Sequence, residues 1–472
     1  MSFIDERRVQ TREKRLTTLS NYNGTLKGIN DEVDVSEIKQ KIRTLSQSNY
    51  DEILYALNAL SFIDETAIVI HGVIGCAASV LEQNSSRNVH WYSSNLNERD
   101  TILGGDEKLR KTVLRAYEEV HARLIFIVGT PVVAINNDDV NSVILELEDE
   151  IDAKVVYITT DGFKTKTPVT GYDIVLHSLL RNVVDRTAID TTEKRDFINV
   201  VTLSENAKNV ASIVKILKDL DINFQLLPRF SDVNSIKKAG YAKATITLNP
   251  DEGEYFAKEL EEVFGVKYIK SSVPIGFRGS RHFIQKLSKA LGIEEKANEY
   301  IRKQEEELDK RINRKLLDGK SVFLDIDLAS AIHFTEFIEK IGGEVGGLGI
   351  RYIDTNNRDN LKKINSLNNS IPVIVANGQL FEKYNVLKKN EVDYYISFDN
   401  QAGYLAQYAN VSISLEASTY LGYEGVEELV KIIENVKNRG DFYDYLRNRD
   451  NSKIKLSWLK KSANWFVKQE VN

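Results

Sequence analysis

The chain has 472 residues, 42% of them hydrophobic and 28% charged, which is enough for roughly two to four domains with buried cores. Its formal net charge of −6 argues against nucleic-acid binding as the main function. A single cysteine excludes a disulfide within the chain and fits a reducing cytoplasm. Residues 1–10 lack the apolar core of a signal peptide, and no apolar run approaches the ~18 residues of a membrane span.

A polar N-terminal arm is predicted over residues 1–30. From there apolar spacing predicts a first α/β unit over 31–195. Its expected helices are 34–45, 51–60, 106–121 (capped by Asp106) and 138–151, and its expected strands are 67–70, 124–130 and 154–158. Residues 94–105 are expected to form a loop and turn. Strands and helices alternating at this spacing are typical of a parallel sheet.

The same alternation restarts twice, which predicts a second unit over 196–318 and a third over 319–472. The second has expected strands at 197–203, 223–227, 244–248 and 266–269, with helices at 205–220, 281–291 and 294–317, the last highly charged. The third has expected strands at 321–325, near 351, and at 373–376, 394–397 and 411–414, and helices at 426–436 and 458–467. We therefore predict an α/β protein of three parallel-sheet, Rossmann- or flavodoxin-like units around a central cleft. Open parallel sheets place functional loops at strand C-terminal ends, so a site between units is expected.

The only cysteine follows the buried strand at 67–70. That strand runs into His71-Gly72 and then Gly75-Cys76, and a helix is expected to follow. A thiolate is favoured at such a position, and glycine allows close approach to the backbone. A lone cysteine also packs as a small buried side chain, and that alternative stays open. His71 either orients a backbone or takes part in proton transfer.

Other common site motifs are absent from the sequence. It has no GxxxxGK[ST] phosphate loop, no GxGxxG, no zinc spacing or HExxH, and no GxSxG. Asp138-Asp139 is interpreted as an N-cap pair rather than a metal site. Glu416, Tyr423 and Glu424 lie in a loop that is compatible with facing the site.

The motif from His71 to Cys76 resembles the HGPxGC loop of the nitrogenase component 1 family. That family includes both nitrogenase subunits, the scaffold that matures the nitrogenase cofactor, and dark-operative protochlorophyllide reductase. Four further segments resemble family motifs in the same order. They are 95–100 with 104–109 (LNExD…GGexKL), 124–130 with 138–139, 273–276 with 283–292, and 421–425 (GYEG). The features of 170–173 and 421–425 lean toward the β-type subunits, and those of 95–100 toward the α type.

The chain departs from the family at two of its three cysteine positions. Residues 21–24, taken as the N-terminal loop, carry no thiol, and Thr130-Pro131 stands at the third position. A cubane cluster takes four ligands. The resemblance therefore implies that Cys76 supplies one ligand of a [4Fe-4S] cluster whose other three come from a homologous partner subunit. A homodimer would supply only two Cys76 thiolates. The eight-iron cluster of nitrogenase is excluded.

The resemblance also implies a function. It implies a subunit of a nitrogenase-like reductase, heterodimeric or heterotetrameric, that receives electrons from an ATP-hydrolysing iron–sulfur protein. His71, Gly72, Gly75 and Cys76 are the expected cofactor-binding residues, with Cys76 the metal ligand. The central cleft is expected to hold either a further metallocofactor or an organic substrate. Two alternatives remain: a non-catalytic scaffold for metallocluster assembly, and a cluster-free binding protein of the same fold.

Overall fold

The structure is a computed structural model, and most of the chain from residue 21 to residue 445 is described. The described ranges are 21–33, 52–76, 89–162, 169–189, 194–204, 206–354, 357–365, 370–376, 380–390, 392–398, 411–439, 441–443 and residue 445. The predicted helices at 34–45 and 458–467, and the helix expected after Cys76, lie outside these ranges.

The first unit is a four-stranded parallel sheet in the order β4-β3-β5-β6. The strands are β3 (Thr66–His71), β4 (His90–Ser93), β5 (Leu124–Gly129) and β6 (Lys154–Ile158). Successive residues of a strand face opposite sides of a sheet. Accordingly, Ile68 packs with helices α3 (Glu52–Leu60) and α9 (Thr170–Asn182), whereas Val69 packs with α6 (Asp106–Val120) and α8 (Val140–Glu148).

The second unit is a parallel sheet in the order β11-β10-β7-β8. Its strands are β7 (Arg195–Thr202), β8 (Phe224–Pro228), β10 (Ala242–Thr247) and β11 (Lys267–Ile269). Its helices are α10 (Ala207–Asp219), α11 (Val233–Lys237), α12 (Pro250–Phe264), α13 (Gly276–Leu291) and α14 (Glu294–Arg311). A short parallel pair, β2 (Ile63–Asp64) with β9 (Ser231–Asp232), joins the first unit to the second.

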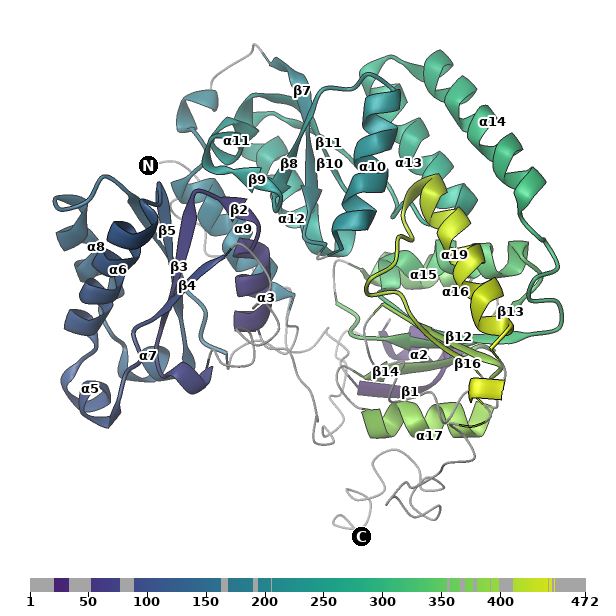
Figure 1. The fold of residues 1–472 in the computed structure, drawn as a ribbon, viewed down its shortest axis with the longest axis horizontal. Coiled ribbons are helices and arrows are strands. Elements are labelled where there is room, and N and C mark those ends of the chain that lie inside the picture. The colour runs from purple at the N-terminus through teal and green to yellow at the C-terminus, as the bar shows by residue number, and fades with distance from the viewer. Residues whose placement is uncertain are drawn as a thin grey trace, which may run out of the picture.

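The third unit is a six-stranded sheet in the order β1-β14-β13-β12-β15-β16. Its parallel strands are β12 (Ser321–Asp325), β13 (Glu344–Ile350), β14 (Pro372–Ala376), β15 (Tyr394–Ser397) and β16 (Val411–Ser414). Its helices are α15 (Leu328–Lys340), α16 (Arg358–Asn365), α17 (Leu380–Asn390) and α19 (Gly422–Lys437). Figure 1 shows the three units in turn along the chain, in dark blue, teal and green to yellow.

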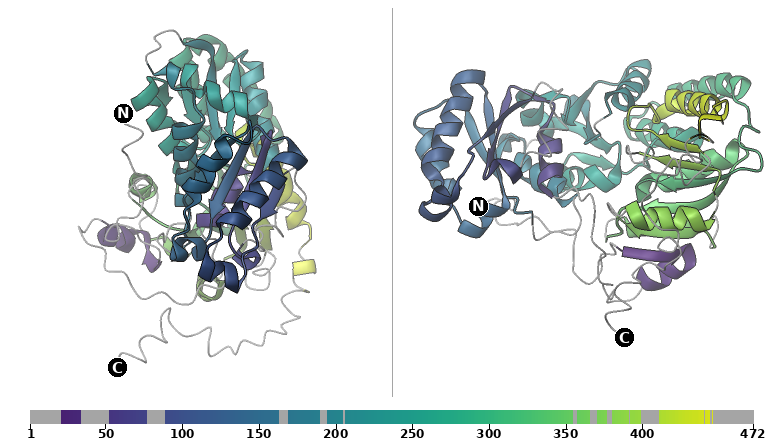
Figure 2. Two further views of the ribbon diagram at one scale, coloured as in Figure 1. Left: turned by 90° about the vertical axis from the view of Figure 1, so that its left-hand side faces the viewer. Right: turned by 60° about the horizontal axis from the view of Figure 1, so that its bottom comes forward.

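One strand of the third sheet comes from the other end of the chain. Strand β1 (Asn21–Thr25) lies antiparallel on β14, and helix α2 (Leu26–Val33) follows it. Both are purple in Figure 2, against the green third unit. The Tyr22 side chain is buried in the core of this unit. The predicted polar arm therefore contains an ordered strand. The sequence Asn21–Thr25 does not suggest a strand, because Tyr22 is the only large apolar residue among these five.

The predicted fold class is confirmed: three parallel-sheet α/β units surround a central cavity. The predicted loop at 94–105 is wrong in part, because α5 (Glu98–Leu103) forms inside it. Helix α7 (Pro131–Asn136) was also not predicted, and Gly105 rather than Asp106 is the N-cap of α6. The boundaries near 195 and 318 stay a prediction. No helix in the described ranges is both long and apolar enough to cross a bilayer.

Candidate functional site

The cysteine loop lies at the C-terminal end of the buried strand β3. Gly72 has a φ of +152°, and a Cβ there would lie 1.9 Å from Thr130 Oγ1. Residues Ile74–Cys76 then form a single 3₁₀ turn, in which the Cys76 amide donates to the Val73 carbonyl at 3.0 Å. Cys76 is partly exposed, so it is not a fully buried packing cysteine. At Gly75 an added Cβ would meet no atom of the described residues within 4 Å, its two chain neighbours aside.

His71 fixes the entrance to this loop from a fully buried position. Ser94 Oγ accepts a hydrogen bond from the Gly72 amide at 2.9 Å and lies 2.9 Å from His71 Nδ1. The Ser94 hydroxyl also lies 3.5 Å from the Gly72 carbonyl oxygen, to which it can donate, so both tautomers of the neutral His71 ring fit these contacts. Thr130 Oγ1 donates to the His71 carbonyl at 2.8 Å. Of the two roles open for His71, these contacts support orientation of the backbone.

Asp138 lies on the other side of the His71 ring. Its Oδ2 is 3.3 Å from His71 Nε2, and its side chain is only 4% exposed. The predicted N-cap pair is therefore half wrong: Asp139 caps α8 by accepting from the Ser142 amide, whereas Asp138 faces the histidine. A Cβ at Gly105 would come within 3.0 Å of Asp138 Oδ2 and 2.9 Å of His71 Cε1, so glycine makes room for this pair.

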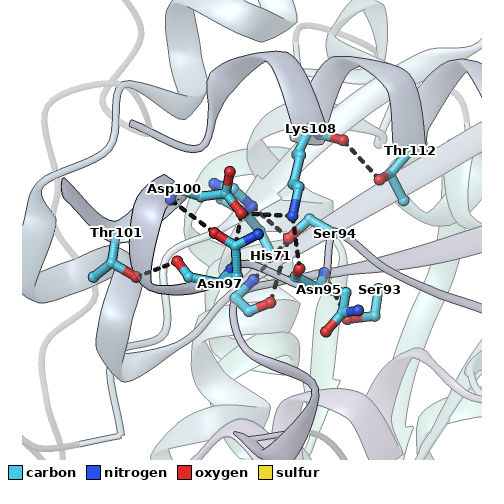
Figure 3. Close-up of polar contacts among 10 residues, drawn as sticks. His71, Ser93, Ser94, Asn95, Asn97, Asp100, Thr101, Lys108 and Thr112 are labelled. Carbon is cyan, nitrogen blue, oxygen red and sulfur yellow. Dashed lines mark hydrogen bonds and ion pairs between the residues drawn. The ribbon is translucent and has the colours of Figure 1, made fainter. Parts of the chain in front are cut away.

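The segment resembling LNExD…GGexKL is a clamp that holds Ser94 in place (Figure 3). Asn97 and Asp100 form a reciprocal capping box at the start of α5. From α6, Lys108 Nζ contacts Asp100 Oδ2 at 2.5 Å and donates to the Asn95 carbonyl at 3.1 Å. These contacts tie residues 95–108 together directly after Ser94, which binds the base of the cysteine loop.

Burial sets the protonation of the histidine–aspartate pair. It lowers the pKa of His71 to about 4, and burial followed by the charge of Asp106 raises the pKa of Asp138. The 3.3 Å contact between the two side chains is longer than a charge-assisted hydrogen bond of about 2.7–2.9 Å, so the ion pair does not offset desolvation. His71 is therefore neutral at pH 7.

This burial predicts a pH-dependent stability. Between pH 6.5 and about 4 the unfolded chain protonates His71 and the folded chain does not. The unfolded state then binds more protons, so we expect the free energy of unfolding to fall by about 3 kcal/mol as the pH drops through this window. Denaturant unfolding at pH 7 and pH 4.5 measures the change.

The variant His71→Asn isolates this contribution from other titrating groups. We expect it to flatten the acid limb relative to the natural chain, while a control substitution at the exposed His90 leaves the limb as it was. Equal acid sensitivity of the His71 variant and the natural chain would contradict a neutral, buried His71.

Large apolar side chains are exposed around the cysteine loop. Ile74 in the loop is 52% exposed, Ile102 and Leu103 at the end of α5 are 82% and 71% exposed, and Ile135 on α7 is 71% exposed. Helices α5 and α7 contact each other, and a shallow depression lies between Val73 and the start of α5. Exposed apolar side chains that gather on one surface indicate a protein contact.

A second feature is a cavity of about 210 Å³ between the three units. The first unit contributes residues of α3 and α9, and the other two contribute the C-terminal ends of β7, β10, β12 and β15. Its lining residues in the described ranges include none from the cysteine loop. Of the three residues flagged in the sequence, Glu416 lines this cavity. Tyr423 instead donates to Glu305, and Glu424 pairs with Lys215, so neither lies in the described lining.

Sequence reasoning missed the supporting residue Ser94 and gave Asp138 the role of an N-cap instead. The signal for Ser94 was positional, because it directly follows β4, which pairs with the strand that ends at His71. The described residues contain no group of three or more His, Cys, Asp or Glu side chains able to hold a metal ion. Among the described residues, Cys76 would therefore supply one ligand of a metal centre, and the other ligands would come from elsewhere.

The profile of the family described as "Nitrogenase component 1 type Oxidoreductase" matches residues 53–437. The chain is 27% identical over 336 residues to the nitrogenase iron-molybdenum cofactor biosynthesis protein NifE of Clostridium pasteurianum, covering 68% of this chain and 72% of that protein. It is 24% identical over 397 residues to the nitrogenase molybdenum-iron protein alpha chain of Methanothermobacter thermautotrophicus, covering 78% and 83%.

Solved structures show the same fold. "Nitrogenase Cp1 at pH 6.5" superposes with a TM-score of 0.73 at 19% sequence identity, covering 89% of this chain and 98% of that one. The profile match spans most of the chain and includes the cysteine loop, the clamp and the central cavity. The chain belongs to the nitrogenase component 1 type oxidoreductase family.

Proposed function

We propose that this protein is a subunit of a component 1 type reductase and that Cys76 supplies one ligand to a [4Fe-4S] cluster shared with a homologous partner subunit. In this proposal the partner brings three cysteines, and an ATP-hydrolysing iron–sulfur protein supplies electrons. The single observation that carries it is the cysteine loop. Its Cys76 is partly exposed, and the preceding backbone is held by hydrogen bonds of Ser94 with His71 and Gly72.

The residues of the loop fit one corner of such a cluster. Cys76 is the thiolate that would bind it, and His71 and Ser94 hold the preceding backbone without competing for the metal. No described residue beyond its chain neighbours lies within 4 Å of a Cβ placed at Gly75, which leaves room for an external group to approach this backbone. When bound, the cluster supplies one-electron redox chemistry. The rest of the ligand set must come from outside this chain.

The exposed apolar side chains of the loop, α5 and α7 support a protein contact at this surface. A cluster that bridges two subunits needs the second subunit at the cysteine loop. One of the exposed apolar side chains, Ile74, lies in this loop. For the whole assembly we infer a heterodimer or heterotetramer. We assign it to the cytoplasm because a lone thiolate ligand requires a reducing compartment.

We expect Cys76→Ala to remove iron from the complex with the partner subunit and to abolish its broad visible absorption. Thermal unfolding of the variant should stay close to that of the natural chain, because Cys76 is not a core residue. Iron analysis and absorption spectra of the co-purified complex measure the effect. An unchanged iron content and an unchanged absorption spectrum would contradict the assignment of Cys76 as a ligand.

A companion variant, Gly75→Ala, separates the cluster from the fold. The new methyl group meets no atom of the described residues beyond its chain neighbours, so we expect the isolated subunit to unfold as before. Iron retention in the complex should nevertheless fall, because the methyl group occupies space beside the thiolate. If both the fold and the iron content are unaffected, nothing approaches this backbone closely.

A second candidate is a scaffold for metallocluster assembly. Similarity to NifE proteins of both Clostridium pasteurianum and Methanococcus maripaludis, which are biosynthesis proteins, favours it. The two functions differ in turnover. A reductase consumes ATP and reducing equivalents through many cycles when the iron protein is present. A scaffold instead accumulates a multi-iron precursor and releases it to an acceptor protein with little turnover.

A further inference from the structure

The donor groups of the central cavity do not suit an iron–sulfur metallocofactor. Such clusters are held by thiolates and in some cases by imidazoles. Among the described residues that line the cavity there is neither a cysteine nor a histidine. The charged lining consists of three carboxylates, Glu252, Asp327 and Glu416, and one guanidinium, Arg351. A cluster built from sulfide and thiolate would bring more negative charge to an acidic site.

The carboxylates lie close to the inner wall of the cavity. Burial, followed by the negative charges of Asp327 and Glu252, raises the pKa of Tyr420, which shows that both carboxylates act on this phenol. Burial also raises the pKa of Asp327, and Arg351 acts in the opposite direction. Arg351 Nη1 donates to the Tyr55 hydroxyl at 3.3 Å, which attaches the guanidinium to the wall that α3 contributes.

Four aromatic side chains complete the lining as two pairs. The rings of Phe398 and Tyr420 are stacked, with centroids 4.5 Å apart and planes at 9°. The rings of Tyr55 and Tyr172 are tilted, with centroids 4.9 Å apart and planes at 56°. Aromatic faces and carboxylates together attract organic cations through the ring quadrupole and direct charge.

Some of the helix amides that could bind an anion at the cavity already have partners. Helices α10, α12 and α15 begin there, with N-caps Asn206, Asn249 and Asp327. Each cap side chain accepts from an amide of its own first turn. Asp251 Oδ2 accepts from the Ala329 amide as well. These four amides are therefore bound by the chain's own oxygen atoms and are not available to a ligand.

We propose that the central cavity binds a small organic cation, such as a substituted ammonium or sulfonium group, rather than a metallocofactor. The inference rests on the proposed function only in taking the cavity between the units as the ligand site. The cavity of about 210 Å³ has room for a small organic molecule.

Three probes of nearly the same shape and different charge test this directly. They are choline, 3,3-dimethylbutan-1-ol and 3,3-dimethylbutanoate, titrated calorimetrically into the full-length protein and into its complex. We expect choline to bind about tenfold more tightly than the neutral alcohol, and the acid to bind least. Equal or tighter binding of the alcohol or the acid overturns the proposal, and so does the absence of binding by all three.

Variants locate the binding to the cavity. Asp327→Asn keeps a good N-cap for α15 while removing the charge, and Glu416→Gln removes a second charge. We expect each to weaken choline about three- to tenfold without changing the alcohol. The control Asp152→Asn, at an exposed site in the first unit, should have no effect. If the control weakens choline as much as the cavity variants do, the attraction is general and the assignment fails.

Iron measurements on the same preparations keep this inference separate from the shared cluster. If Cys76→Ala loses its iron and still binds choline, both proposals stand. A complex that keeps iron at Cys76 and binds no choline overturns the cavity assignment alone. Iron that stays in the Cys76→Ala complex and is displaced by substitutions in the cavity overturns it as well.

Discussion

Lys383→Ala should destabilise the protein by about 3–5 kcal/mol, because it leaves a buried carboxylate without its counter-ion. Lys383 Nζ on α17 lies 2.5 Å from Asp325 Oδ2 at the end of β12, and both side chains are only 4% exposed. Tyr395 on the neighbouring strand β15 donates to the same oxygen. Denaturant unfolding with a constant slope between variants measures the loss.

An exposed pair of equal length provides the matched control. Lys243 Nζ also lies 2.5 Å from a carboxylate, that of Asp196, but the two side chains are 49% and 80% exposed. Lys243→Ala should cost less than about 1 kcal/mol. The double variant Asp325→Asn with Lys383→Met should recover most of the stability, since it removes the buried charges together. A similar small cost for both lysines would show that burial of the Lys383 pair is unimportant.

Gly171→Ala is expected to cost about 3 kcal/mol and to disturb the central cavity. A Cβ at Gly171, in the first turn of α9, would lie 2.0 Å from the Glu52 carbonyl oxygen and 2.8 Å from the Ala56 amide nitrogen. Both are backbone atoms of α3, so no side chain can move aside and the helices must separate. Thermal and denaturant unfolding measure the cost.

The cavity gives this variant a second measurement. Helix α3 contributes Tyr55 and α9 contributes Tyr172, so moving the helices apart also separates these two rings. We therefore expect weaker choline binding in Gly171→Ala. The control is Gly75→Ala, where an added methyl group meets none of the described residues beyond its chain neighbours. A Gly171 variant as stable as the Gly75 variant would contradict the close packing of α3 on α9.

The fold was predictable from the sequence wherever buried strands form continuous apolar runs. The strands Lys154–Ile158, Ser321–Asp325 and Tyr394–Ser397 have the predicted bounds because parallel strands covered on both faces read as such runs. Helix α5 was missed because Ile102 and Leu103 point outward, so its apolar residues do not form a core-facing stripe. Strand β1 was missed because its pairing partner is at the other end of the chain.

The site was predictable only in its local part. The turn from His71 to Cys76 and its glycines follow from the motif, since glycine is needed where Thr130 crowds the backbone. The contact between His71 and Asp138 depends on how two strand ends meet across the sheet, which no local spacing encodes. The acidic, aromatic lining of the cavity is assembled from three units, and only Glu416 was singled out beforehand.

The pairing of β1 with β14 has a consequence for synthesis on the ribosome. Thr25 pairs with Pro372, so the described strand nearest the start of the chain waits for more than three hundred residues before its ladder can close. Contacts this distant along the chain are slow to form. The first two sheets can fold during translation, whereas the third is completed last. Until β14 has emerged, β1 has no partner in its sheet, and unpaired strand edges promote aggregation, so we expect this stage of synthesis to depend most on chaperones.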